Sequence, residues 1–450
     1  RVNPNTLFIL AKMARTYPNA VGSWWDHGLQ KAVLFAFSSR DNRVRENAIK
    51  VVDPLSKGGV QLNGLPDIIE NYIVRALSDT NNSVRTCALQ LVQGIDSNGW
   101  RLLQSHVQNE ILRLVSFSFH DNAPKVRTAA SYVVGTYVMR EWAQTEEMLR
   151  SFAKDLLAIL EKEQTLVVVS RCAWALANLC SSLVPKQKND RQEKNDNKAM
   201  TGANYSENLF NLTKHISDVV VSLAENFEDQ SQTQDKIRTS SIRALGSLGQ
   251  YWAIHYGLHN SLAIENMEFQ TVVKKKGNKK GNSNNISAAR NKKKDYDKPT
   301  KIDARNEMQM LELIANTLLK HLDCGTPKTR WNACHALGGI YEASCIHQKF
   351  GFLSEQSWHI KSLKLLLICM KSTNFKVRIN AITATRSLLS MFDFPENADE
   401  DLFELFSKTV SQCIENVDKD TDFAQYQYKE TLTEQCEKTL MHLESLKQNE

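Results

Sequence analysis

The residues of this sequence best suited to chemistry are histidines that could bind a metal ion. His255 and His259 are four residues apart, a spacing that places two imidazoles on one face of a helix. Tyr256 stands where a zinc protease needs its glutamate, and no third ligand is evident. We therefore expect no metal centre at these histidines.

A second candidate is a cluster of cysteines and histidines near residue 335. It consists of Cys324, Cys334, His335, Cys345 and His347. Their separations are those of residues on different helices rather than of a tight zinc knuckle, so ordinary packing is expected. The nine cysteines of the chain are odd in number, scattered and never in a C-x-x-C pair, which predicts reduced thiols inside the cell.

Enzyme motifs are missing from the sequence. It contains no Gly-rich phosphate loop and no G-x-S-x-G nucleophile turn, so it predicts neither a phosphate cradle nor a serine nucleophile. We expect no enzymatic activity and no cofactor.

The formal charge of +6 points at first to an anionic partner, but it is concentrated in one segment. Residues 274–301 hold eleven basic and two acidic residues, a net of +9 that leaves −3 on the rest of the chain. Lys279 and Lys280, followed after ten residues by residues 291–295 with Lys292, Lys293 and Lys294, have the form of a bipartite nuclear-localisation signal or an anion-binding loop. A merely solvated loop is the alternative.

Two segments have the composition of disordered insertions. Residues 271–303 contain the Lys-rich run, and residues 184–205 contain a polar stretch without an apolar member at 186–198. Both fall in the long gaps of an internal repeat.

The repeat that must position these residues is a turn, then Val-Arg, then a small residue three positions later. Its anchor position recurs at intervals of 40, 42, 42, 69, 92 and 48 residues, near the 40 to 47 or so of a HEAT or armadillo unit once the insertions are removed. The anchors are Arg45, Arg85, Arg127, the Val169 slot, Arg238, Arg330 and Arg378.

Each anchor begins a helix with one apolar face. In the first copy, Val44, Ala48 and Val51 stack on that face, and the small middle residue allows a neighbouring helix to approach closely. Preceding helices are expected at 24–37, 65–76 and 107–119. The acids Asp79, Asp121 and Glu163, six residues before their anchors, suit a turn or N-cap role.

Composition agrees with an all-α chain. Hydrophobic residues make up 42%, enough for a core, whereas 18 Gly and 9 Pro are few for a β protein with many turns. The longest clear apolar run, 363–370, is too short to span a bilayer. We predict a single HEAT/armadillo-type α-solenoid over residues 1–450, a right-handed superhelix of stacked helix pairs.

Several stretches resemble one family. Residues 329–338 resemble its V-R-W-N-A-C-Y-A-[LM]-G repeat, carried by Arg330, Trp331, Asn332, Ala333 and Cys334. Residues 173–179, 242–248, 374–379 and 421–428 are similar to further motifs. The family is that of HEAT repeat-containing protein 6. The resemblance implies the C-terminal part of a longer solenoid, in keeping with the start at Arg1 rather than Met. It implies no activity and no particular partner.

The functional expectation is a non-enzymatic scaffold or adaptor in the cytoplasm, the nucleus or both. Its concave surface, formed by the anchored helices, would bind an extended protein segment. Two alternatives are a karyopherin-like nuclear transport receptor and an RNA-associated protein acting through the basic loop. Nucleic acid is not expected elsewhere on the chain.

Overall fold

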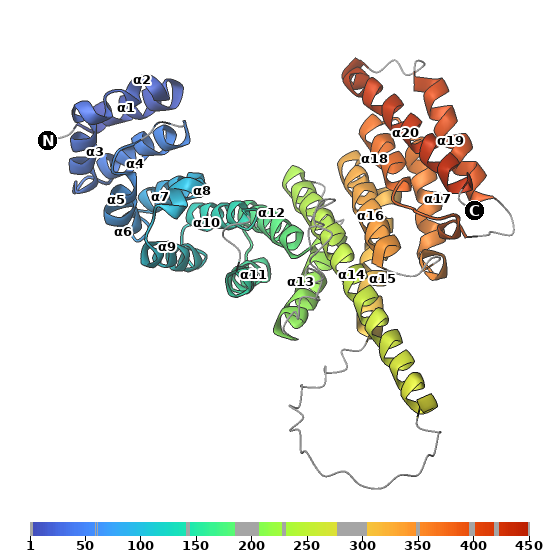
Figure 1. Ribbon diagram of the computed structural model, residues 1–450. Coiled ribbons are helices and arrows are strands. Elements are labelled where there is room, and N and C mark those ends of the chain that lie inside the picture. The colour runs from blue at the N-terminus through green and yellow to red at the C-terminus, as the bar shows by residue number, and fades with distance from the viewer. Residues whose placement is uncertain are drawn as a thin grey trace, which may run out of the picture. The chain divides into compact units, whose positions relative to one another are not determined.

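The computed structural model describes residues 3–58, 60, 62–140, 145–184, 207–226, 231–276, 304–347, 352–395, 401–417 and 423–448. Within these ranges every regular element is a helix. Successive helices form antiparallel pairs that stack on one another (Figure 1). The protein is an all-α solenoid of HEAT/armadillo type, which confirms the fold class predicted from the repeat.

The chain divides into two compact units. Unit 1 comprises residues 1–183 and 207–244, and unit 2 comprises residues 184–206 and 245–450. The boundary falls inside helix α14 (Gln232–Lys276). The continuity of one solenoid over all 450 residues stays a prediction.

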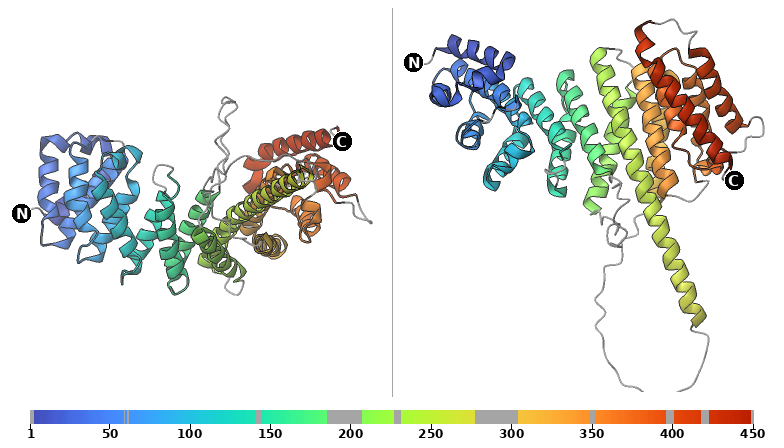
Figure 2. Two further views of the ribbon diagram at one scale, coloured as in Figure 1. Left: turned by 60° about the horizontal axis from the view of Figure 1, so that its bottom comes forward. Right: turned by 45° about the horizontal axis from the view of Figure 1, so that its top comes forward.

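In unit 1 each anchored helix follows a helix of its own repeat. The anchored helices are α4 (Asn42–Lys57), α7 (Asn82–Gly94), α10 (Pro124–Tyr137), α12 (Leu166–Leu183) and the start of α14. The helices before them are α3 (Gln30–Phe37), α5 (Leu65–Ile68) with η2 (Ile69–Ile73) and α6 (Val74–Ala76), α9 (Ser105–Ser118), α11 (Glu146–Leu160) and α13 (Glu207–Glu225). Helices α1 (Pro4–Thr16), α2 (Pro18–Gly22) and α8 (Ser97–Arg101) complete the unit. Consecutive anchored helices pack side by side, α4 on α7, α7 on α10 and α10 on α12 (Figure 2).

Unit 2 repeats the same pairing. Its pairs are α15 (Ala304–Cys324) with α16 (Pro327–His347), α17 (His359–Met370) with α18 (Phe375–Thr385), and α19 (Leu402–Asn416) with α20 (Lys429–Gln448). Short helices η4 (Leu353–Glu355), η5 (Met391–Asp393) and η7 (Phe423–Tyr428) lie in the connections. The last pair has no Val-Arg phrase, so the sequence pattern missed it, although α20 packs on α18 as an anchored helix would.

The small residue of the repeat phrase is buried in every copy. None is more than 1% exposed, and the seven are Ala48, Ala88, Ala130, Cys172, Ser241, Ala333 and Ala381. Glycine allows still closer contact in places: a Cβ added at Gly246 would lie 2.8 Å from the Cβ of Ala336 on α16. This confirms that small side chains set the approach of neighbouring anchored helices.

Polar residues start the anchored helices where the turn signals predict. The side chains of Asp41, Asn81 and Asn374 accept hydrogen bonds from backbone amides in the first turns of α4, α7 and α18. Such caps satisfy amides that have no partner inside the helix. Pro124 starts α10, at the one place where a missing amide hydrogen costs nothing.

The structure changes two predicted boundaries. The helix expected at 24–37 is interrupted by η1 (Trp25–Leu29), because Gly28 has a φ of 114°, a conformation that glycine adopts without strain. The insertion expected at 271–303 begins later, since α14 continues through Lys276. The rest of that insertion, and the insertion expected at 184–205 from residue 185 on, lie outside the described residues.

One helix among the described residues is long and apolar enough to span a membrane by length and composition. It is α12, whose 18 residues have a mean hydropathy of 1.5 and are 61% buried. The sequence pattern did not single it out because Arg171 interrupts the apolar run. Its contacts with α10 and α11 are those of a core helix.

Close helix packing predicts that a larger side chain at the small position of α7 destabilises the protein. We expect Ala88→Leu to destabilise unit 1 by about 1–3 kcal/mol, because the new atoms must displace the facing helices. Gln90→Leu, on the exposed side of the same helix, should change stability by less than about 0.5 kcal/mol. Urea unfolding followed by tryptophan fluorescence measures both, and equal effects would contradict the packing account.

Candidate functional site

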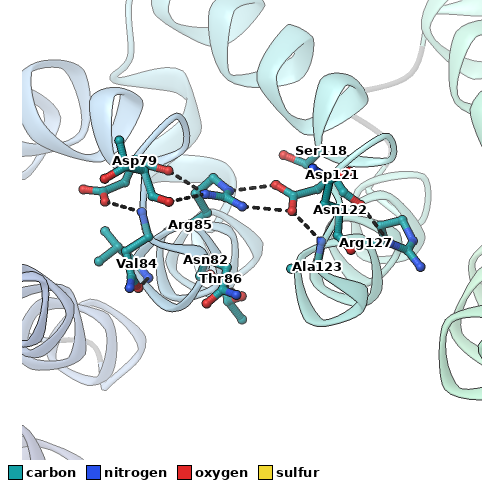
Figure 3. A network of polar contacts seen from close by, with 12 residues as sticks. Asp79, Asn82, Val84, Arg85, Thr86, Ser118, Asp121, Asn122, Ala123 and Arg127 are labelled. Atoms are coloured by element: carbon teal, nitrogen blue, oxygen red, sulfur yellow. Dashed lines mark hydrogen bonds and ion pairs between the residues drawn. The ribbon is translucent and has the colours of Figure 1, made fainter.

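The first three anchor arginines join neighbouring repeats. Arg45 donates from Nε and Nη2 to the two carboxylate oxygens of Asp79, at 2.7 Å each. Arg85 binds Asp121 in the same way at 2.7 and 2.9 Å. Figure 3 shows Arg85 reaching from its own turn to Asp121 of the next one. Arg127 lies 2.6 Å from Glu163, which completes a series that we call the Arg–acid ladder.

Each ladder arginine also closes its own turn. The Nη1 group donates to the carbonyl six residues earlier, at 2.8 Å in Arg45, 2.6 Å in Arg85 and 2.8 Å in Arg127. A guanidinium has five N–H donors in a rigid plane, so one side chain can satisfy a carbonyl of its own turn and the carboxylate of the next. The ladder therefore fixes the spacing between successive turns.

The carboxylates of the ladder are tied to the backbone as well. Asp79, Asp121 and Glu163 each accept the amide hydrogen two residues later, at 2.9, 2.8 and 2.9 Å, which confirms their turn role. Partial burial is the largest single influence and raises the pKa of Asp79 and Asp121. The hydrogen bonds from Arg45 and Arg85, the backbone amide bonds and the arginine charges together outweigh it, and the pKa of both carboxyls lies below the ordinary value. The ion pairs are therefore intact at neutral pH.

The sequence pattern missed the pairing between repeats. It placed each acid in the turn before its own anchor, whereas the carboxylate binds the arginine of the repeat before. A usable signal was present, because the separations from arginine to acid are 34, 36 and 36 residues. The ladder ends where Val169 replaces the fourth arginine.

The later anchors keep a contact with a backbone carbonyl, and Arg238 also lies 4.0 Å from the carboxylate of Asp235 on its own helix. Arg238 donates to the carbonyl of Asn226 at 3.1 Å, Arg330 to that of Leu322 at 3.0 Å, and Arg378 to that of Ser372. Where the first copies have an acid six residues before the arginine, unit 2 has Cys324 and Ser372. The printed contacts of these three arginines thus differ from those of the Arg–acid ladder.

A groove crosses the exposed side of three anchored helices in unit 1. We call it the unit 1 groove, and its volume is about 620 Å³. Its lining includes Gln90 and Gln93 from α7, Lys125 and Tyr132 from α10, and Val167 and Arg171 from α12. Val167 is 62% exposed. The three helices are held parallel by the small residues and the ladder, so the groove follows from the stacking itself.

Aromatic rings support one cation in this groove. The Arg171 guanidinium carbon lies 4.6 Å from the centre of the Tyr132 ring and 5.3 Å from that of Trp174. The two rings are 5.2 Å apart. Because Trp174 belongs to an anchored helix, the sequence predicts that it lies in the core. It is only partly buried and packs over Gly135, where a Cβ would lie 2.3 Å from its ring. Glycine on α10 thus makes room for this platform.

The family-motif residues lie on α16 in unit 2, and they differ from one another in burial. Trp331 and Asn332 are partly exposed, whereas Ala333 and Cys334 are buried. The Lys376 ammonium lies 4.9 Å from the Trp331 ring and 4.8 Å from the Tyr428 ring. This contact joins three segments, α16, α18 and η7.

Arg330 faces a thiol instead of a carboxylate. Its Nη2 group lies 3.5 Å from the sulfur of buried Cys369. A hydrogen bond from Cys334 and the nearby guanidinium lower the pKa of Cys369 to about 7. A sulfur atom thus lies opposite this arginine, where a carboxylate lies opposite the ladder arginines.

The metal-ligand candidates are not gathered into a site. Cys324 ends α15, as expected of residues on different helices, whereas Cys334, His335, Cys345 and His347 all lie on α16, where that expectation is wrong. Cys334 and Cys345 are nonetheless about 16 Å apart along the helix axis. In the part of the chain that the structure describes, no group of three or more His, Cys, Asp or Glu side chains could hold a metal ion. His255 stacks on Tyr251, and the side chain of His259 lies outside the described residues.

The five lysines of the basic loop, Lys279, Lys280, Lys292, Lys293 and Lys294, also lie outside the described residues. Their role as a nuclear-localisation or anion-binding element stays a prediction.

Comparison with known proteins gives few relatives by sequence. No family model matches the chain. An uncharacterised protein of Dictyostelium discoideum is 23% identical over 445 residues, covering 83% of this chain and 27% of that protein. The chain therefore spans about a quarter of this relative's length.

Solved structures that are similar to the chain are helical repeat proteins. An engineered protein has a TM-score of 0.42 at 12% identity, covering 98% of this chain and 95% of its own. A designed armadillo repeat protein has a TM-score of 0.41 at 15% identity, covering 72% and 99%. Kap121p bound to Pho4p has a TM-score of 0.39 at 13% identity, covering 98% and 40%. The fold of the chain is established by its own helices and their packing.

The ladder predicts a stability difference between buried and exposed ion pairs. We expect Asp121→Asn to destabilise unit 1 by about 2 kcal/mol, because it leaves the largely buried Arg85 without its counter-charge. The control Glu110→Gln removes an ion pair with Arg113 whose side chains are 39% and 63% exposed, and should cost less than about 1 kcal/mol. Urea unfolding at pH 7 measures both, and equal costs would refute a structural role for the ladder.

A buried histidine in unit 2 predicts a pH effect. His359 is fully buried, and its Nε2 lies 2.7 Å from the carbonyl oxygen of Asp393. Burial lowers the pKa of His359 to about 4, although the bond to Asp393 opposes the shift. The unfolded chain takes up this proton near pH 6.5, so stability should fall as pH decreases from 6.5 towards 4.

We expect the wild type to lose about 2 kcal/mol more than His359→Gln between pH 7 and pH 5. Urea unfolding of both proteins at the two pH values measures the difference. An identical pH dependence would show that His359 does not titrate in this way.

Proposed function

We propose that the chain is a non-enzymatic repeat scaffold that binds an extended segment of a partner protein along the exposed side of the anchored helices. The unit 1 groove carries this proposal. It is open, it runs over α7, α10 and α12, and apolar groups such as Val167 and the Tyr132 ring face it. Stacked repeats present such elongated surfaces as a consequence of their geometry, and an extended segment can follow them repeat by repeat.

A larger cavity of about 800 Å³ lies between α9 and α11 on the outer helices. Its lining includes Phe117, which is 69% exposed, and Met148. We place the partner in the unit 1 groove because the ladder holds the turns of its three helices in register.

We also propose that the chain belongs to the HEAT repeat-containing protein 6 family. The support is the resemblance of residues 329–338 together with the position of that motif at the start of an anchored helix, α16.

The scaffold proposal predicts that a bulky residue in the groove blocks binding. Gln90 is exposed and lines the groove, so Gln90→Trp should reduce recovery of groove-bound partners at least about tenfold in quantitative affinity purification, without unfolding the chain. A synthetic peptide covering the mapped partner segment should then bind the wild type directly and compete with the whole partner.

The matched control is Asn109→Trp, which places the same ring on the exposed side of α9. It should leave partner recovery unchanged. If the wild type, Gln90→Trp and Asn109→Trp all recover the same partner proteins, binding in the unit 1 groove is contradicted. It is also contradicted if only Asn109→Trp loses partner proteins. Far-UV circular dichroism checks that each variant is folded.

A further inference from the structure

The charges in the unit 1 groove have one sign. Lys125 and Arg171 line it, and none of the described lining residues is acidic. Of the acids nearest in sequence, Asp121 and Glu163 have side chains that are 11% and 8% exposed and are bound to Arg85 and Arg127. The third, Asp96, is exposed, and its side chain accepts a hydrogen bond from the amide of Gly99. The Arg–acid ladder thus keeps its carboxylates away from the groove, and the two groove cations are not neutralised by it.

Arg171 has the geometry of a prepared receptor for a carboxylate. Its guanidinium is supported by Tyr132 and Trp174, and within the described residues no ion pair or hydrogen bond involves its side chain. A guanidinium held against aromatic rings keeps its N–H donors in its own plane, where two of them can form parallel hydrogen bonds to one carboxylate. Because the rings already restrict the side chain, binding orders it at little further cost.

The position of Arg171 in the repeat is unusual. It lies two residues after the anchor slot, where the other copies have Asn47, Cys87, Ala129, Ser240, Asn332 and Asn380. A charged residue therefore occurs at this position only in the fourth copy. That copy also lacks the anchor arginine, so Arg171 does not belong to the ladder.

Resting on the proposed function, we infer that the segment bound in the unit 1 groove is acidic, with an Asp or Glu carboxylate on Arg171, a second negative charge near Lys125, and an apolar side chain against Val167. A single-stranded nucleic acid would also present negative charge and stackable rings. Grooves for single strands follow the phosphates with many cations, whereas this one has two cations among apolar and amide groups.

The test begins with random 12-residue peptides displayed on phage. Peptides that bind the immobilised full chain are selected, and those that also bind the Gln90→Trp variant are removed. Display as an amino-terminal fusion removes the free C-terminal carboxylate as an alternative ligand. We expect groove-dependent peptides to be enriched in Asp and Glu beside an apolar residue. Affinity of a synthetic peptide of the selected sequence should fall as salt rises.

Substitutions then locate the carboxylate. Arg171→Gln should weaken binding of that peptide about 10-fold or more, and Arg171→Lys should recover part of the loss, since charge remains without the planar fork. Lys125→Gln, at an exposed position that cannot disturb the core, should weaken it several-fold. Arg101→Gln, an exposed arginine outside the groove, is the matched control and should have no effect.

The other outcomes separate this inference from the proposed function. Groove-dependent peptides that lack acidic enrichment, or that bind Arg171→Gln and Lys125→Gln as well as the wild type, would overturn the acidic segment and leave the scaffold standing. Selection that yields no peptide sensitive to Gln90→Trp would overturn both. Binding of a fluorescent 12-nucleotide oligouridylate that is lost in Arg171→Gln would replace the acidic segment with nucleic acid.

Discussion

The close approach of neighbouring anchored helices is the constraint on which the rest of the structure depends. A pair of helices of this size has too little interior to bury its own apolar face, so each pair must pack on the next. The small residue in each repeat phrase permits this, and all seven are buried. Once the helices are this close, their turns and exposed sides come into register, which makes both the Arg–acid ladder and the unit 1 groove possible.

The ladder and the groove use the same type of side chain for opposite purposes. Arg45, Arg85 and Arg127 lie at the turns, where a carboxylate of the next repeat and a carbonyl of their own turn occupy their donors. Arg171 lies on the exposed side of α12 against two aromatic rings. Largely buried guanidinium groups need counter-charges to be tolerated, whereas the partly exposed guanidinium of Arg171 is supported by two aromatic rings and is accessible to a ligand. The two roles differ in their place in the repeat, because Arg171 lies two positions after the anchor position that the ladder arginines occupy.

Unit 2 shows that the fold does not require the ladder. Its arginines still bind carbonyls of the preceding turns, but a thiol faces Arg330, and the ammonium of Lys376 lies against Trp331 and Tyr428. Helix packing supplies the common frame, and polar contacts vary from copy to copy. Differences in surface chemistry between repeats are what would allow a scaffold to distinguish its partners.

The sequence by itself determined the helical repeat, the seven anchors, most helix positions and the role of the small residues, because these follow from local periodicity and turn chemistry. It missed the α19–α20 pair, whose phrase has diverged, and it expected Trp174 in the core. Only the tertiary structure decided that Asp79 and Asp121 bind the arginines of preceding repeats and that Arg171 lies on Tyr132 and Trp174. The physical reason is that these contacts join side chains on different helices, and their partners are chosen by how the helices stack rather than by any spacing within one repeat.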